Sequence, residues 1–447
     1  MKNLYVFNVN TRGAMYGIGT YIEQLAKCSI KKDMNVYIVE INASCEEFKV
    51  ETKNGIRYIY IPWPSVYPSG LGFARLLTII QNYTPFFLKE FVKQGDENIF
   101  HLNRMEFLPL AKNLKAYFDG KIVLTMHYTN WSMLLLGDKT KLRRILKKHP
   151  DSLVASERQI YDEVIEGREL INDYCDKIIA ISQHSYNDII SVYGANPKKV
   201  VQINNALQDH YRPASEEKKT SIRQEVHIGA NEMVLIYAGR VDEVKGIFVL
   251  VAAFIEILKT HPHCRLIIAG SGQLDTVMEQ AKYVASKITF TGFVPKKTLY
   301  RLYSVADIGI VPSIHEEFGY VALEMMMHNI PVVASDTTGL AEIIENNVTG
   351  LKTTLKRGKR QLKASAVDLA ATINRLIENE SMRKQYGNNG RKRFKDRYSY
   401  CLFEKRMVEL YNNIIKNQQE LKLLGLFQLY SIYHKAILSF CILMQNI

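Results

Sequence analysis

Two basic residues lie in one short segment of the second half of the sequence, between an apolar run and a helical pattern. The apolar run ends at Gly239, Arg240 follows at once, and Lys245 comes directly before Gly246. Two cations in one strand-to-helix loop can neutralise a diphosphate and stabilise negative charge that develops on it. The alternative is a solvated loop with ordinary surface charges, and this segment alone favours neither interpretation.

Two carboxylates, Glu316 and Glu324, follow a second strand-like run and lie eight residues apart. Glu316 belongs to the loop segment 312–319, and Glu324 lies about one turn inside the helical pattern 320–329. Both side chains can therefore face a ligand lodged at the N-terminus of that helix. Carboxylates accept hydrogen bonds from sugar and ribose hydroxyls. The pair predicts a site for a nucleotide sugar, which carries such hydroxyls on both sides of its diphosphate.

Three further features are weaker signals. Gly17 and Gly19 follow the first strand-like run and open a helical pattern, where backbone amides can approach a phosphate or the turn can simply connect two elements. His127 ends the apolar run 122–126, so it either faces a cleft or has a structural role. Gly339 lies in a turn before another helical pattern, which we expect to present free backbone amides.

The elements that position these residues form an α/β pattern, because strand-like runs alternate with helical stretches. The predicted strands of a first sheet are 4–8, 36–41, 99–102, 122–126 and 177–182. After a polar stretch with the composition of a linker, the strands of a second sheet are 234–238, 265–269, 288–291, 308–311 and 331–335. We therefore expect two doubly wound, Rossmann-like units in tandem, with ligands at the carboxyl ends of strands that face a shared cleft.

Composition and charge limit the class of protein. A chain of 447 residues that is 47% hydrophobic, with 12 prolines, is globular and long enough for two domains. Its six cysteines form no Cys-x-x-Cys pair, which argues against a zinc cluster or a disulfide framework and fits a reducing cytoplasm. The N-terminus lacks the features of a signal peptide, so we expect a cytoplasmic protein. The net charge of +13 indicates an acidic partner, but no zinc-finger or helix-turn-helix pattern supports nucleic acid.

Taken together, these motifs resemble the retaining glycosyltransferases of family 4, which have the GT-B fold. The similar segments are Gly-Arg-x5-Gly at 239–246, Gly-Phe-Val at 292–294, Ser-x2-Glu-x-Phe-Gly at 313–319 with the second glutamate at 324, and Gly339. The resemblance extends to about Tyr411. The chain departs from the pattern with Ala206 and Glu317 where glycine is common, and with Ile18 between two glycines that are often adjacent. These departures bear on loop shape and donor preference, and none removes a charged group.

The resemblance implies a role for each matching residue. Arg240 and Lys245 would bind the donor diphosphate, Glu316 the sugar hydroxyls and Glu324 the ribose, with His127 beside the donor sugar. The rest of the donor site would comprise Gly17, Gly19, Phe293, Val294, Phe318, Gly319, Tyr320, Gly339 and Leu340. No metal and no cofactor are expected, because the cations take the place of a metal. Base contacts through the backbone near residue 293 do not distinguish a UDP-sugar from a GDP-sugar.

The implied activity is hexosyl transfer, with retention of configuration, to a lipid-linked or polysaccharide-precursor glycan. Two alternatives remain open. An isomerase of the nucleotide-sugar 2-epimerase type would share the architecture and the ligand without transferring anything. A non-catalytic nucleotide-sugar-binding scaffold would lack some charged groups, whereas Glu316, Arg240 and Lys245 are all present.

We divide the chain into an acceptor-side domain (1–207), a linker (208–230), a nucleotide-sugar-binding domain (231–395), helices that return to the first domain (396–420) and an apolar tail helix (421–447). The tail is interrupted by charges and is too polar to span a bilayer. It either packs on protein or lies in a membrane interface. In the second case the basic segment 139–148 would help to hold the enzyme at the inner face of the cell membrane.

Overall fold

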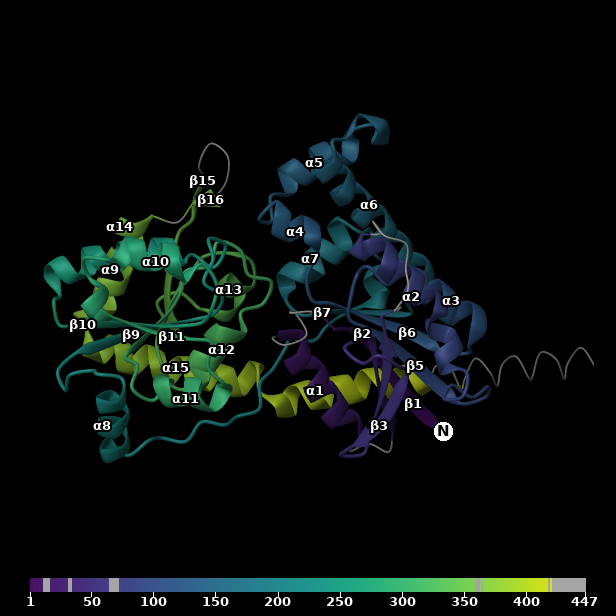
Figure 1. The fold of residues 1–447 in the computed structure, drawn as a ribbon, viewed down its shortest axis with the longest axis horizontal. Coiled ribbons are helices and arrows are strands. Elements are labelled where there is room, and N and C mark those ends of the chain that lie inside the picture. Colours follow the sequence, from purple (N-terminus) through teal and green to yellow (C-terminus); the bar gives the residue numbers. More distant parts are fainter. Residues whose placement is uncertain are drawn as a thin grey trace, which may run out of the picture.

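The structure is a computed structural model, and it describes residues 1–10, 17–30, 34–63, 72–357, 362–363, 365–416 and 419. Two α/β lobes lie side by side, with the first half of the chain in one and most of the second half in the other (Figure 1). Each lobe has a sheet covered by helices on both faces. The expected fold class, two Rossmann-like units, is confirmed. The tail 421–447 lies outside the described residues.

The N-terminal lobe is built on a sheet that has eight strands within the described residues. In spatial order the strands are β3 (Lys49–Lys53), β4 (Ile56–Pro62), β2 (Asn35–Ala43), β1 (Lys2–Val9), β5 (Glu97–Leu102), β6 (Lys121–Met126), β7 (Lys177–Ala180) and β8 (Val200–Gln202). All neighbours are parallel except β3 and β4. Each of the five predicted strands of this sheet is present.

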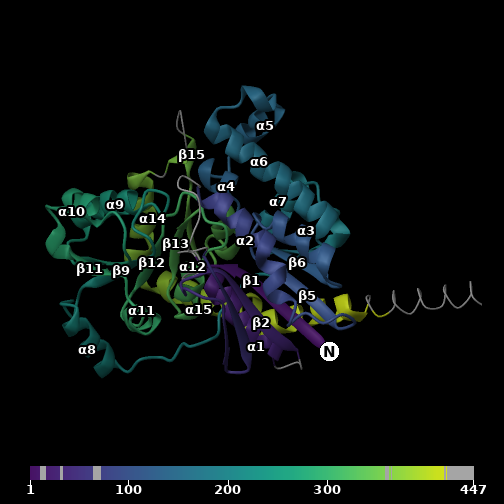
Figure 2. The same cartoon turned by 45° about the vertical axis from the view of Figure 1, so that its right-hand side comes forward.

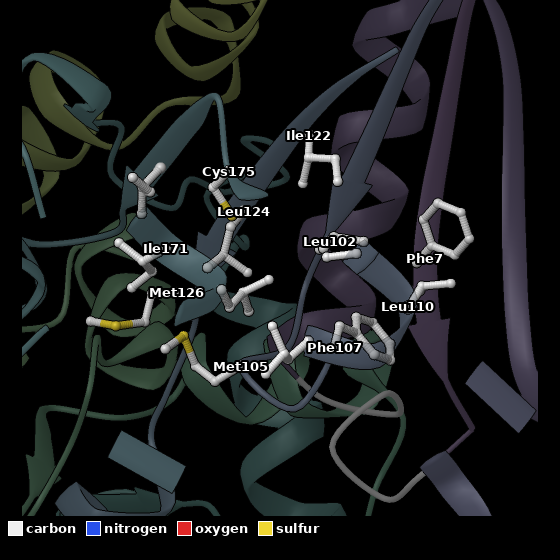
Figure 3. Close-up of a cluster of buried hydrophobic side chains, with 14 of the residues drawn as sticks. Phe7, Leu102, Met105, Phe107, Leu110, Ile122, Leu124, Met126, Ile171 and Cys175 are labelled. Atoms are coloured by element: carbon white, nitrogen blue, oxygen red, sulfur yellow. The ribbon is translucent and has the colours of Figure 1, made fainter. Parts of the chain in front are cut away.

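The helices of this lobe cross between parallel strands, as parallel pairing requires. They are α1 (Gly17–Ile30), α2 (Phe73–Leu88), α3 (Leu108–Tyr117), α4 (Asn130–Leu134), α5 (Lys139–Lys147), α6 (Ala155–Glu169) and α7 (Gln183–Ser191). The core on one face of the sheet includes Phe7, Leu102, Leu124 and Met126, which Figure 3 shows among their neighbours. Because helices pack on both faces of the sheet, its strands are held in place and their carboxyl ends have defined positions.

The C-terminal lobe is built on a parallel sheet, for which the described residues supply β11 (Ile288–Gly292), β10 (Cys264–Ala269), β9 (Met233–Ala238), β12 (Ile308–Val311), β13 (Val332–Ser335) and β14 (Gly350–Thr353), in that order. Its helices are α9 (Ile247–Thr260), α10 (Leu274–Ala281), α11 (Lys296–Tyr303), α12 (Tyr320–Met327), α13 (Thr338–Ile343), α14 (Ala366–Ile377) and α15 (Glu380–Arg397). A short antiparallel pair, β15 (Lys356–Arg357) and β16 (Leu362–Lys363), lies outside this sheet. The predicted strands of the second sheet are all present.

The predicted linker 208–230 contains a helix, α8 (Glu216–Glu225). Ser215 caps its N-terminus, and the Ser215 side chain accepts a hydrogen bond from the Lys218 amide. Only Ile222 of this helix is buried. Because a helix that buries a single apolar residue has an almost entirely polar sequence, composition alone did not reveal it.

The chain returns to the N-terminal lobe after α15. A helix begins at residue 400, continues to residue 416 and runs beneath that lobe in both views (Figures 1 and 2). Phe403, Met407 and Tyr411 are buried in one cluster with strands of the N-terminal sheet. The Tyr411 hydroxyl lies 2.6 Å from Nδ1 of the buried His101. Within the described part of the chain, no helix is both long enough and apolar enough to cross a bilayer.

Candidate functional site

In the C-terminal lobe, the loops that follow β9 and β10 are in direct contact through their backbones. Gly239 follows β9, and Gly270 and Gly272 follow β10. A Cβ on Gly270 would overlap the carbonyl oxygen of Gly239, and one on Gly272 would overlap that of Val241. Sequence reasoning missed Gly270 and Gly272, although Gly-Ser-Gly directly after an apolar run was a signal for close approach. This packing fixes the loop that carries Arg240.

The loop 240–246 is locked onto the loop that carries Glu316. The Ile314 amide donates to the carbonyl of Val244 at 2.8 Å. Gly246 has a φ of 73° and lies so close to Pro312 that a Cβ would overlap its carbonyl oxygen. The sequence therefore needs glycine at this position. As a result, Lys245 Nζ lies 2.5 Å from Oε2 of Glu316, and the predicted cation and carboxylate meet.

Arg240 lies at the outer side of the same loop. Its side chain is 49% exposed and pairs with Asp242 at 3.2 Å. Asp242 also accepts a hydrogen bond from the Lys245 amide at 2.9 Å. The carboxylate of Asp242 therefore joins the Arg240 side chain to the backbone at the other end of the loop.

The turn at Gly339 differs from what we expected. Its amide is not free, because it donates to the carbonyl of Glu316 at 2.8 Å. A Cβ on Gly339 would lie 2.6 Å from backbone atoms of Glu317 and Phe318. Glycine is therefore required for close packing of α13 against the 316–318 loop. The Glu316 amide in turn donates to Thr338 Oγ1 at 3.0 Å, so the α13 turn holds the backbone of Glu316.

Glu324 is less accessible than its position on α12 suggested. The residue is only 1% exposed, and its carboxylate forms an ion pair with Lys296 and lies 3.5 Å from the hydroxyl of Tyr303. Lys296, the first residue of α11, is more than half exposed. In this structure the exposed lysine covers the carboxylate of Glu324, so its role toward a ligand stays a prediction. Sequence reasoning missed Lys296, which comes three residues after Phe293.

The remaining donor-site residues of the C-terminal lobe divide into two groups. Phe318 and Leu340 are buried in the hydrophobic core, so their side chains cannot line an open site. Phe293 is 61% exposed, and Val294 is partly buried beside the core. Gly319 caps the N-terminus of α12, and Tyr320 is the first residue of that helix.

The N-terminal lobe contributes a neutral, buried histidine. His127 follows β6 and is 8% exposed, and burial lowers its pKa to about 3. The Asn103 amide nitrogen donates to the carbonyl of Phe7, so Asn103 Oδ1 faces His127 Nε2 at 3.0 Å. Nε2 therefore carries the proton, and Nδ1 is the acceptor of the ring. Tyr21 packs edge-on against the imidazole.

Gly17 and Gly19 lie in the first turn of α1 rather than in a loop before it. A Cβ on Gly17 would lie 3.1 Å from the ring of Tyr320, so the two lobes touch at this point. A second contact joins Ser132 of α4 to His315 of the 312–319 loop. The structure therefore brings Arg240, Lys245, Glu316 and the Gly339 turn together, and places Gly17 against Tyr320. The contacts of His127 with Asn103 and Tyr21 lie within the N-terminal lobe.

The histidine, cysteine and acidic residues described by the structure include no cluster of three or more that could hold a metal ion. The polar side chains at the strand ends are instead two cations, each paired with a carboxylate. Such a site can accept an anionic ligand through Arg240 and Lys245, and hydroxyl groups through the carboxylates.

Residues 218–393 match the family model of glycosyl transferases group 1. The C-terminal lobe is a glycosyltransferase group 1 domain. All of the predicted charged site residues, Arg240, Lys245, Glu316 and Glu324, fall inside this match. His127 and the other N-terminal residues fall outside it.

An uncharacterized glycosyltransferase of Methanocaldococcus jannaschii is 31% identical over 256 residues. The alignment covers 56% of this chain and 63% of that protein. The similarity therefore extends beyond the group 1 domain, but the chain matches less than two thirds of the relative's length.

Solved structures share the whole fold. Sucrose-phosphate synthase from Thermosynechococcus elongatus superposes with a TM-score of 0.74 at 20% identity, covering 93% of this chain and all of that one. HepE of Anabaena, in complex with UDP, superposes with a TM-score of 0.68 at 18% identity, covering 92% of this chain and all of that one. The two lobes together have the GT-B fold.

Proposed function

We propose that this chain is a retaining hexosyltransferase of family 4, which transfers a sugar from a UDP- or GDP-sugar to a glycan acceptor without a metal or a cofactor. The observation that carries the proposal is the ion pair of Lys245 with Glu316 at the carboxyl ends of the strands of the C-terminal lobe. Arg240, paired with Asp242, belongs to the same loop as Lys245. The UDP complex of HepE, which has the same fold, supports a nucleotide-sugar donor.

Arg240 and Lys245 would act on the leaving group. As the glycosidic bond breaks, negative charge grows on the donor diphosphate, and cations that are already in place stabilise that charge most in the transition state. The loop contacts to Ile314 and Pro312 hold Lys245 ready for this role. Catalysis in this account is electrostatic, and the cations take the place that a metal ion holds in other phosphate chemistry.

The two carboxylates would hold hydroxyl groups on opposite sides of the diphosphate. Glu316, whose backbone is held by the α13 turn, would bind the donor sugar. Glu324 would bind the ribose after Lys296 moves away, and Lys296 is exposed enough to do so. The backbone beside Phe293 and Val294 would contact the base, and Gly17 would let the N-terminal lobe approach the phosphates.

His127 would lie beside the donor sugar as a neutral group. Its burial keeps it uncharged at neutral pH, so it would offer a hydrogen-bond acceptor without adding charge to the reacting centre. Retention of configuration is part of the proposal because of the resemblance to family 4. In that reaction the departing phosphate helps to take the proton of the acceptor hydroxyl on the same face of the sugar.

The proposal is tested by incubating the protein with a panel of nucleotide sugars and analysing both halves of each donor. Transfer or slow hydrolysis releases free nucleotide and removes sugar from the donor. An epimerase of the nucleotide-sugar type would instead yield a new sugar epimer, and a binding scaffold would shift the melting temperature without any turnover. Appearance of either of these two patterns with a bound donor would refute the transferase proposal.

We further propose a lipid-linked or polysaccharide-precursor acceptor, reached at an anionic membrane surface on the cytoplasmic side. On α5, Lys139, Arg143 and Lys147 recur every four residues and line a cavity of about 210 Å³ together with Arg168 and apolar Leu142. Among the described residues, one carboxylate pairs with this row, Asp188 with Lys139. A row of like charges on one helix face opposes helix formation unless an anion neutralises it.

Helices α4, α5 and α6 project together from the N-terminal lobe (Figure 2), and exposed apolar residues precede and follow α5 in the sequence. Leu134 of α4 and Val154, which precedes α6, are both largely exposed. We expect full-length protein to sediment with anionic liposomes at low salt and to be released at high salt. If both full-length protein and a chain ending at Gln418 stay in the supernatant at low salt, the membrane proposal is wrong. To test the α5 row, the sedimentation of an Arg143→Gln, Lys147→Gln variant is compared with that of a Lys219→Gln, Lys282→Gln variant, whose lysines lie elsewhere on the surface. Only the first variant should sediment less than the wild type.

A further inference from the structure

Two sets of polar contacts between the lobes, both formed by described residues, lie at different places. One lies close to the point where the chain crosses between lobes, because Leu207 pairs through its backbone with Tyr398 and Tyr400. There Glu342 of α13 accepts hydrogen bonds from the Gln183 amide at 2.6 Å and from Asn204 at 3.1 Å. Asn204 lies three residues before Leu207 in the sequence, so this contact moves little when the lobes pivot about their connections.

The other contact joins Ser132 to the loop that carries Glu316. His315 Nε2 lies 3.0 Å from Ser132 Oγ and 3.0 Å from Oε1 of Glu317. His315 is 3% exposed, so the histidine is enclosed between the two lobes. Because this contact is formed by α4 rather than by the connecting segments, opening of the lobes would break it.

Ser132 has a fixed place in the N-terminal lobe. Glu163 accepts hydrogen bonds from the amides of Asn130 and Trp131 at 2.8 and 3.0 Å, which holds the first turn of α4. Trp131 is fully buried, and its indole donates to the Tyr193 hydroxyl at 3.2 Å. The N-terminal lobe therefore presents a rigidly placed hydroxyl to His315.

The protons of this group can be assigned from its partners. Burial opposes the charge of Glu317, but hydrogen bonds from His315 and Ser132 outweigh it and hold the pKa of Glu317 below its ordinary value. An ionised carboxylate only accepts, so His315 carries a proton on Nε2. Its Nδ1 finds no hydrogen-bond partner among the described residues. It lies beside Gly137, where an added Cβ would be 3.6 Å from Nδ1.

A second polar atom is enclosed at the same boundary. The Tyr320 hydroxyl finds no hydrogen-bond partner in the described part of the chain, and the ring of Tyr320 packs against Gly17 of the other lobe. Burying a polar atom without a partner costs free energy, and this cost is similar in size to the free energy that one hydrogen bond between the lobes contributes to closure. A ligand that binds between the lobes and contacts both of them can shift the equilibrium toward the closed arrangement.

We propose that His315 is a positioning residue that couples closure of the two lobes to the placement of the neighbouring Glu316. In the closed arrangement Ser132 and Glu317 hold the His315 ring, and the backbone of the next residue, Glu316, is fixed with it. Glu317 supplies the carboxylate that orients the ring. The choice of UDP as the ligand rests on the proposed function, whereas the inference about closure of the lobes does not.

The test combines small-angle X-ray scattering with calorimetric titration of UDP into full-length protein. We expect Ser132→Ala and His315→Phe to enlarge the radius of gyration of the unliganded protein. Both variants should also raise the Kd for UDP about three- to tenfold, as the loss of one hydrogen bond predicts. His315→Gln should restore both values, because its amide nitrogen can take the place of Nε2. Ser191→Ala, which removes an exposed hydroxyl of the same lobe, is the matched control.

The proposal is overturned if the unliganded Ser132→Ala and His315→Phe proteins have the radius of gyration of the wild type. It is also overturned if His315→Gln behaves like His315→Phe, since the hydrogen bond would then not be the cause. Failure of the proposed function looks different. If wild-type protein binds neither UDP nor GDP, the donor assignment is wrong, while the scattering of the unliganded variants still decides the role of His315.

Discussion

The two lobes differ in the charge and the exposure of the polar groups at the ends of their strands. In the C-terminal lobe, Lys245 and Arg240 form ion pairs in partly exposed loops. In the N-terminal lobe, His127 follows β6 and is buried, uncharged and hydrogen-bonded to the side-chain amide of Asn103. The described strand ends of the N-terminal lobe also carry a cation, Arg104 after β5, but its side chain is only 9% exposed and pairs with Glu106 at 3.2 Å.

This difference assigns separate tasks to the two lobes. Partly exposed ion pairs can exchange their partners for a diphosphate, since solvent already screens them in part. A buried neutral group cannot take up charge without a large penalty, so it serves where charge must be excluded. In our account the C-terminal lobe binds the charged part of the donor, and the N-terminal lobe closes over the sugar.

The largest effect that we expect comes from removing the cations. Lys245→Ala and, separately, Arg240→Ala should lower the transfer rate about a hundredfold or more, because each removes a contact to charge that develops in the transition state. The melting temperature should change little, since exposed ion pairs contribute little to folding. Lys282→Ala, which removes an exposed lysine of the same lobe that is paired with Glu279, should leave the rate unchanged. Unchanged turnover in both site variants would contradict the division of tasks.

A smaller effect should separate the two carboxylates. Glu324→Gln should weaken donor binding about tenfold with a modest change in turnover, because the ribose contact is present before and during the reaction. Glu316→Gln should mainly reduce turnover. Kinetics with a single donor over a range of concentrations give both values. Equal donor affinity in the wild type and the Glu324 variant would show that Lys296 keeps this carboxylate occupied during the reaction.

The smallest effect concerns pH and stability. Burial lowers the pKa of His101 and His127 to about 3, so the folded state binds fewer protons than the unfolded chain below an ordinary histidine pKa of about 6.5. Their contribution to stability is present above pH 6.5 and is lost as pH falls toward 3. Below pH 6.5, each histidine should therefore lower the unfolding free energy by up to about 1.4 kcal/mol per pH unit.

Denaturant titrations between pH 7.5 and 4.5 measure this dependence. His127→Asn should have a shallower loss of stability with falling pH than the wild type, because one titrating group is gone. Comparing the two slopes cancels the other ionisable groups of the protein, including Glu163, whose pKa burial raises to about 7. Identical slopes would show that His127 is not kept neutral by folding.

The sequence was sufficient for the fold because strand periodicity in a doubly wound protein is local. Apolar runs such as 122–126 and 308–311 become buried strands at nearly those limits. The hairpin of β3 and β4 was missed, although Asn54-Gly55 at its turn, both with positive φ, was a direct signal. Strand β8, with three residues, is too short to give a pattern.

The candidate site was predicted in its residue types but not in its contacts. Loop motifs located Arg240, Lys245 and Glu316, whereas the burial of Phe318 and Leu340 depends on how α12 and α13 pack in the core. The cover of Lys296 over Glu324 joins positions 28 residues apart, and the contact of Ser132 with His315 joins positions 183 residues apart. Such pairs depend on tertiary structure, and no local pattern in the sequence reports them.

The central claim is that cations of the C-terminal lobe bind a nucleoside diphosphate without a metal. Calorimetric titration of UDP and of GDP in the presence of excess chelator tests it most directly. We predict saturable binding of at least one nucleotide to the wild type, and a Kd raised by tenfold or more in the Arg240→Ala, Lys245→Ala double variant. Binding that appears only when magnesium or manganese is added, or equal affinity in the double variant, would contradict the account.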